Sequence, residues 1–83
     1  MSRMDDETLA GWLEALHLPV SASLLLRGRI TRDVALERLR RALDYKRKYV
    51  AAGPPFEGLT EEDLENIKAW CAQAEEVIDR ATS

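Results

Sequence analysis

The sequence has 83 residues, of which 46% are hydrophobic and 33% charged, and its formal net charge is −3. This composition excludes an intrinsically disordered chain, which combines low hydrophobicity with high net charge. The longest strongly apolar run, Leu24–Leu26, is too short for a membrane-spanning helix, and the acidic start of the chain is unlike a secretory signal. A single cysteine, Cys71, favours a reducing compartment and therefore the cytoplasm.

The first predicted helix covers residues 5–17. Asp5 is a typical N-cap residue, and Met4 and Leu9 have the spacing of a hydrophobic staple. We expect Pro19 to end the helix, because a proline inside a helix removes a backbone hydrogen bond. The apolar positions recur at helical spacing and form one buried face: Leu9, Trp12, Leu13 and Leu16.

The second predicted helix is short and covers residues 21–27, with Ser21 as its N-cap and Gly28 as the left-handed residue that ends it. Its consecutive leucines, Leu24–Leu26, cannot share one narrow face. We therefore expect this helix to be covered on most sides, either by the longer helices or by a partner.

Two long helices follow. The third is predicted over residues 32–52, between the N-cap Thr31 and a Gly-Pro-Pro run. The fourth is predicted over residues 61–81, because Thr60-Glu61-Glu62-Asp63 resembles a capping box. Each helix has an apolar stripe: Leu36, Leu39, Leu43 and Val50 on the third, and Leu64, Ile67, Cys71, Ala74, Ile78 and Ala81 on the fourth.

The connection of residues 53–58 between these helices is short, so we expect an antiparallel hairpin with Phe56 packed over its end. The sequence thus predicts an all-α fold with a single domain, residues 1–83. Its architecture is a compact four-helix bundle, in which two short N-terminal helices pack on a long antiparallel helical hairpin.

Charge is segregated along the chain. The charge balance is −3 over residues 1–20, +6 over residues 21–56 and −6 over residues 57–83. Three interpretations stay open: the basic and acidic helices match each other internally, the basic helix binds nucleic acid, or one charged face binds a partner of opposite charge. Internal matching is the interpretation that the sequence favours, because the two helices are expected to pack side by side.

Nucleic-acid binding by the third helix is the alternative that its aromatic residues suggest, because Tyr45 and Tyr49 lie among the basic residues and can stack on bases. The acidic net charge opposes it, since dedicated nucleic-acid binders are basic. Two acidic residues also stand four positions before a basic one, which favours ion pairs along one helix: Glu37 before Arg41, and Asp44 before Lys48.

No motif in the sequence identifies an enzyme, a cofactor or a metal site. Glu14 and His17 form a Glu-x-x-His pair, the spacing found in di-iron bundles, and a homodimer would supply a second pair as a remote alternative. Glu14 falls opposite the apolar face of its helix, and His17 suits the negative end of the helix dipole as a cap. Cys71 lies within an apolar stripe, where a thiol is inert.

The function that we expect is a non-enzymatic protein–protein interaction module, an adaptor, inhibitor or regulator, with self-association as a homodimer as one form. The reason is a surplus of apolar residues beyond one helical hairpin, in Trp12, Leu24–Leu26, Val34, Tyr45, Ala69 and Ala72. The residues expected to contact a partner are Arg40, Tyr45, Arg47, Lys48, Glu65, Glu75, Glu76 and Asp79. The alanine-, arginine- and leucine-rich composition suggests a bacterial or phage source.

The run Leu26-Arg27-Gly28-Arg29-Ile30-Thr31 before a long helix is similar to the helix–Gly–Ile–Thr–helix elbow of short bacterial oligomerisation hairpins. The chain departs from that pattern directly after the threonine, where Arg32-Asp33 replaces the usual acidic residues. The resemblance is confined to this elbow and the helix after it, so it assigns no family.

Overall fold

The computed structural model describes residues 4–52 and 58–83, which form four α-helices and no strand. The predicted all-α class and the number of helices are confirmed for these residues. The radius of gyration of the Cα atoms is 13.8 Å. The helices are α1 (Asp6–Ala15), α2 (Pro19–Leu26), α3 (Arg32–Ala52) and α4 (Glu61–Thr82).

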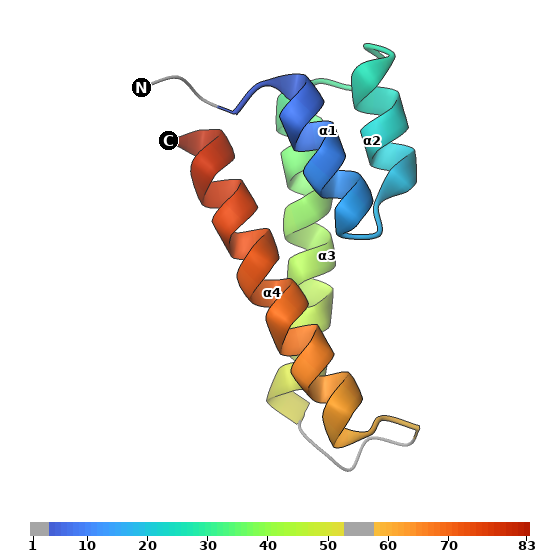
Figure 1. The fold of residues 1–83 in the computed structure, drawn as a ribbon, viewed down its shortest axis with the longest axis vertical. Coiled ribbons are helices and arrows are strands. Elements are labelled where there is room, and N and C mark those ends of the chain that lie inside the picture. Colours follow the sequence, from blue (N-terminus) through green and yellow to red (C-terminus); the bar gives the residue numbers. More distant parts are fainter. Residues whose placement is uncertain (1–3, 53–57) are drawn as a thin grey trace.

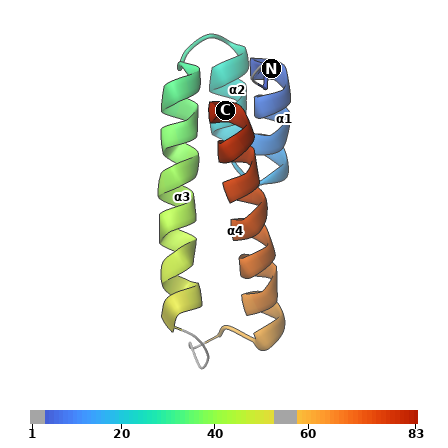
Figure 2. The same cartoon turned by 90° about the vertical axis from the view of Figure 1, so that its left-hand side faces the viewer.

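The two long helices lie side by side, and the two short ones cover one end of them (Figure 1). In Figure 1, α3 runs down the molecule and α4 runs back up. Figure 2 shows from the side that α1 and α2 lie beside the start of α3 and the end of α4. Within the described residues, no helix combines the length and the hydropathy that a membrane span requires.

Capping side chains fix where α1 and α4 begin. The Asp5 carboxylate accepts a hydrogen bond of 2.7 Å from the backbone amide of Thr8, as expected of an N-cap residue. This bond holds the pKa of Asp5 below its ordinary value. At α4 the predicted capping box is confirmed, because Thr60 and Asp63 exchange side-chain to backbone hydrogen bonds, each 3.1 Å long.

The boundary between α1 and α2 differs from the prediction. α1 ends at Ala15, and His17 adopts a left-handed conformation with φ 67°, so it lies beyond the helix whose last turn it was expected to cap. Pro19 was expected only to end the first helix, but it occupies the first turn of α2, where the missing N–H costs nothing. Ser21 is consequently a buried residue within α2 and not its N-cap.

The elbow after α2 follows the predicted glycine termination. Gly28 has φ 70°, and its amide donates to the carbonyl of Leu25. The amide of Arg29 donates to the carbonyl of Leu24, which completes a Schellman motif. α2 is less covered than expected, because Leu25 is buried but Leu26 is 58% exposed.

The core lies where all four helices meet. Its largest fully buried side chains are Leu9, Leu13, Leu16 and Leu39. The buried residues of α3 all fall within residues 32–43, at Ala35, Leu36, Leu39 and Leu43. In α4 they are Leu64 and then Trp70, Cys71, Ala74, Val77 and Ala81. Among the described residues, nothing at the far end of the α3–α4 pair corresponds to the third layer that α1 and α2 supply, and the expected position of Phe56 lies outside these residues.

An arginine joins the start of α3 to the start of α1. The Arg32 guanidinium donates hydrogen bonds to the backbone carbonyl of Met4 and to the carboxylate of Asp6, the latter at 3.2 Å. Arg32 is part of the basic stretch of the sequence, but these bonds direct it toward α1 and not toward α4.

Candidate functional site

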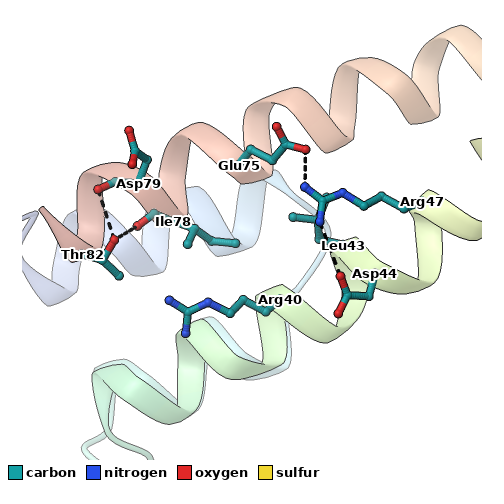
Figure 3. A pocket seen from close by; sticks show the side chains of 8 residues that line it. All are labelled: Arg40, Leu43, Asp44, Arg47, Glu75, Ile78, Asp79 and Thr82. Atoms are coloured by element: carbon teal, nitrogen blue, oxygen red, sulfur yellow. Dashed lines mark hydrogen bonds and ion pairs between the residues drawn. The ribbon is translucent and has the colours of Figure 1, made fainter.

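A groove of about 310 Å³ lies between α3 and α4 and brings together expected contact residues from both helices (Figure 3). The buried Leu43 and the half-buried Ile78 form its apolar part. Around them lie the polar side chains of Arg40, Asp44, Arg47, Glu75, Asp79 and Thr82. Half of the expected contact residues therefore share one groove, namely Arg40, Arg47, Glu75 and Asp79.

Arg47 links the two long helices by charge. Its guanidinium donates a hydrogen bond to the Glu75 carboxylate of α4 and lies 3.5 Å from Asp44 on its own helix. The hydrogen bond to Glu75 raises the pKa of Arg47, because it stabilises the charged guanidinium. Arg40 extends along the groove toward the C-terminal end of α4 in Figure 3. It forms no ion pair with any residue that the structure describes.

Most basic residues of the stretch 21–56 do not pair with α4. Among the described residues, Arg47 alone forms an ion pair between α3 and α4. Arg41 pairs with Glu37 of its own helix at 3.2 Å, and Lys46 Nζ lies 4.6 Å from the centroid of the Trp70 ring. Ion pairs between α3 and α4, which the sequence favoured, therefore neutralise little of the positive charge of residues 21–56. Basic residues with no ion pair or ring contact in the described chain are Arg27, Arg29, Arg38, Arg40 and Lys48.

Tyr45 and Lys48 lie outside the groove, on the side of α3 that faces away from α4. Tyr45 is 59% exposed, and its hydroxyl lies 2.9 Å from that of Tyr49. The two rings meet edge-on with their centroids 5.3 Å apart. The hydrogen bond between the hydroxyls raises the pKa of Tyr49. This side of α3 therefore combines exposed cations with an ordered aromatic pair.

Glu65 and Glu76 lie on the exposed side of α4. Each forms an ion pair within the helix, Glu65 with Lys68 at 3.6 Å and Glu76 with Arg80 at 2.7 Å. Both partners of each pair are largely exposed, so these pairs are screened by solvent and hold the carboxylates only weakly. The two carboxylates remain accessible to a partner.

Two rows of exposed residues with steps of 4, 3, 4 and 3 mark these outer sides. The α3 outer seam consists of Val34, Arg38, Arg41, Tyr45 and Lys48. The α4 outer seam consists of Glu65, Ala69, Ala72, Glu76 and Asp79, and at Asp79 it reaches the groove between α3 and α4. All ten side chains are exposed. Arg38 and Arg41 were not among the expected contact residues, although the alternating spacing that identified the apolar stripe of α4 would have found them.

The residues with metal- or thiol-chemistry potential are Glu14, His17 and Cys71. Glu14 and His17 are both exposed, and no group of three or more His, Cys, Asp or Glu side chains could hold a metal ion within residues 4–52 and 58–83. Cys71 is buried, and burial raises the pKa of its thiol. The thiol is therefore protonated at neutral pH and a poor nucleophile.

Comparisons of the chain with protein-family models, with curated proteins and with solved structures find no significant match.

Proposed function

We propose that this chain is a non-enzymatic protein–protein interaction module, an adaptor, inhibitor or regulator, that binds through the outer sides of its two long helices. The observation that carries the proposal is that three cations of α3 point away from the acidic helix α4. Arg38 and Lys48 are exposed on the side of α3 away from α4 and form no ion pair with any described residue, and Arg41 beside them pairs only with Glu37 of α3. Arg47 is the one residue of the stretch that pairs with an acid of α4 in the described chain. Cations that form no ion pair within the chain are available to the carboxylates of a partner.

Exposed apolar side chains support the same proposal. Tyr45 lies amid the cations of the α3 outer seam, and tyrosine is a frequent anchor of protein interfaces. Val34 is 42% exposed on the same seam. The proposal takes the fold to be a compact bundle in which the antiparallel α3–α4 hairpin presents both seams. It also places the protein in the cytoplasm, which the free, buried Cys71 favours, and in a bacterium or a phage-infected cell, which the alanine-, arginine- and leucine-rich composition suggests.

The experiment that tests the proposal is affinity capture from an extract of the native host, quantified for three baits. The wild type should retain a specific protein, of which the endogenous copy of the chain is one candidate. The variant Arg38→Glu/Lys48→Glu should lose it. The matched control Arg27→Glu/Arg29→Glu changes the net charge equally on the exposed elbow after α2 and should retain it. Identical captured proteins for all three baits would contradict the proposal.

Nucleic-acid binding is the second candidate, and the Tyr45–Tyr49 pair beside Arg38, Arg41 and Lys48 is the observation that favours it. The test is retention on nonspecific DNA and on heparin at low salt. A nucleic-acid binder would be retained and would elute steeply as salt rises. Under the first proposal we expect no retention of the wild type on DNA, because the chain carries a net charge of −3.

A further inference from the structure

We propose that two copies of this chain bind each other, with the α3 outer seam of one copy against the α4 outer seam of the other and the two helices antiparallel. This inference rests on the proposed function, because it names a second copy as the partner of the charged outer sides. The α3 outer seam carries three cations and no carboxylate, and the α4 outer seam carries three carboxylates and no cation. Charge complementarity is thus what identifies the occupant.

The two seams also match in length and period. Each spans 14 residue steps, from Val34 to Lys48 and from Glu65 to Asp79. At 1.5 Å per residue each seam is about 21 Å long. When the steps in a row of residues alternate between four and three, the side chains of that row stay on one side of the helix. Such a row can face a partner helix along its whole length, as in a coiled coil. Two such rows can therefore stay in contact from end to end.

The antiparallel direction gives the better set of facing residues. It places two cations opposite carboxylates and the large Tyr45 opposite the small Ala69, where the ring has room. The facing pairs are Val34 with Asp79, Arg38 with Glu76, Arg41 with Ala72, Tyr45 with Ala69, and Lys48 with Glu65. In the parallel direction both arginines would face alanines and Tyr45 would face Glu76. The antiparallel direction is therefore the one that we assign.

Ion pairs within each copy leave these residues able to bind. Arg38, Lys48 and Asp79 have no ion pair with any described residue. Glu65 and Glu76 are paired within α4, but these pairs are exposed, and a carboxylate has two oxygens that can each accept from a different cation. A second copy would therefore extend these pairs into networks without first breaking them.

The two seams point in different directions on one molecule, because the α4 outer seam reaches the α3–α4 groove at Asp79, whereas the α3 outer seam points away from that groove. The Arg47–Glu75 pair marks the edge at which α3 faces α4, and Tyr45, two residues before Arg47, lies about 160° around the helix from it at 3.6 residues per turn. The contact is therefore heterologous, so each pair of copies leaves one α3 outer seam and one α4 outer seam free. The assembly should grow with concentration unless it closes into a ring.

Sedimentation velocity and light scattering of the full chain at low and high salt test the inference. The wild type should associate at low salt and dissociate as salt screens the seams. Arg38→Glu/Lys48→Glu makes the α3 outer seam acidic, and Glu65→Lys/Glu76→Lys makes the α4 outer seam basic. Each variant alone should associate more weakly on the order of ten-fold or more. An equimolar mixture of the two should associate again, and so should the chain that carries all four changes.

Two matched controls carry the same charge changes away from the seams. Arg27→Glu/Arg29→Glu controls the first variant, and Glu7→Lys/Glu14→Lys on the exposed side of α1 controls the second. Both should associate like the wild type, and circular dichroism should give equal helix content for all variants. A wild type that stays monomeric at low salt, a seam variant that associates like its control, or a folded four-fold variant that stays monomeric would each overturn the inference.

These outcomes separate the inference from the proposed function. A monomeric wild type whose Arg38→Glu/Lys48→Glu variant loses a different host protein would reject the second copy and keep the protein-binding function. A monomeric wild type retained on DNA, with retention lost in the same variant, would reject both and assign the α3 outer seam to nucleic acid.

Discussion

The indole nitrogen of Trp70 on α4 donates a buried hydrogen bond of 2.8 Å to the backbone carbonyl of Leu16, which follows α1. This bond joins two segments that are 54 residues apart. It satisfies a carbonyl beyond the end of α1 that the helix itself leaves without a partner. The same ring lies under Lys46, so one side chain holds α1, α3 and α4 together.

Trp70→Phe should destabilise the fold, because it keeps an apolar ring but leaves the Leu16 carbonyl buried without a donor. The expected loss is about 1–3 kcal/mol in the free energy of unfolding. Urea titration followed by circular dichroism measures it. Trp12→Phe is the control, since Trp12 is half-buried and its indole donates no hydrogen bond in the described structure. Equal losses for both variants would contradict the role of the bond.

Leu39→Ala should cost about 2–5 kcal/mol, because Leu39 is fully buried and its truncation leaves a cavity. That is a large fraction of the roughly 5–15 kcal/mol that stabilises a typical domain. Thermal unfolding should show a much lower midpoint. Leu26→Ala removes the same atoms from a side chain that is 58% exposed, so its change should stay within about 0.5 kcal/mol.

Two glycine substitutions should act in opposite directions. Gly28→Ala should destabilise by about 1–2 kcal/mol, since Gly28 holds φ 70° and an alanine there is strained. Gly11→Ala should stabilise by about 0.5–1 kcal/mol, because Gly11 lies inside α1 and an added Cβ meets nothing within 4 Å. Chemical denaturation of both variants in parallel measures the difference. A loss at Gly11 would show that α1 is not helical there in solution.

Acidification should remove part of the stability of α1 through Asp5. The bond from Thr8 lowers the pKa of Asp5 in the folded chain, so its contribution is complete above the unfolded value of about 3.9 and is lost as the pH falls through the lower folded value. Asp5→Asn retains a capping oxygen but cannot titrate in this range. Urea midpoints from about pH 6 down to about pH 2 should fall more for the wild type than for Asp5→Asn. Parallel pH profiles would contradict the assignment.

The long helices were predictable because their signals are local. Thr60 and Asp63 fix the start of α4 through bonds three residues apart, and the apolar steps of α3 place Leu36, Leu39 and Leu43 on the buried face. The boundary of α1 and α2 was not predictable in this way. Pro19 is compatible both with ending a helix and with beginning one, and the packing of α1 on α2 decides which.

The sequence predicts which residues of α3 and α4 are charged. It does not predict which of these residues face the other long helix. The sequence shows that α3 is basic and α4 acidic, yet the helical period distributes the cations all around α3. Which of them faces α4 depends on where α1 and α2 sit, and that is set by contacts between residues far apart in the chain. Arg47 faces Glu75, whereas Lys48, its neighbour in sequence, faces solvent.

The uneven cover of the long helices implies a gradient of local unfolding. From Asp44 to Ala52, α3 contributes no residue to the buried core, whereas residues 32–43 contain all of its buried residues. Opening free energies rise with the apolar burial that an opening must expose. Amide hydrogens of residues 44–52 and 61–67 should therefore exchange with solvent through sub-global opening, while those around Leu39 and Ala74 exchange through global unfolding. The region around Leu39 and Ala74 should therefore be stable, and residues 44–52 and 61–67 should open more easily. Each outer seam includes residues of both regions.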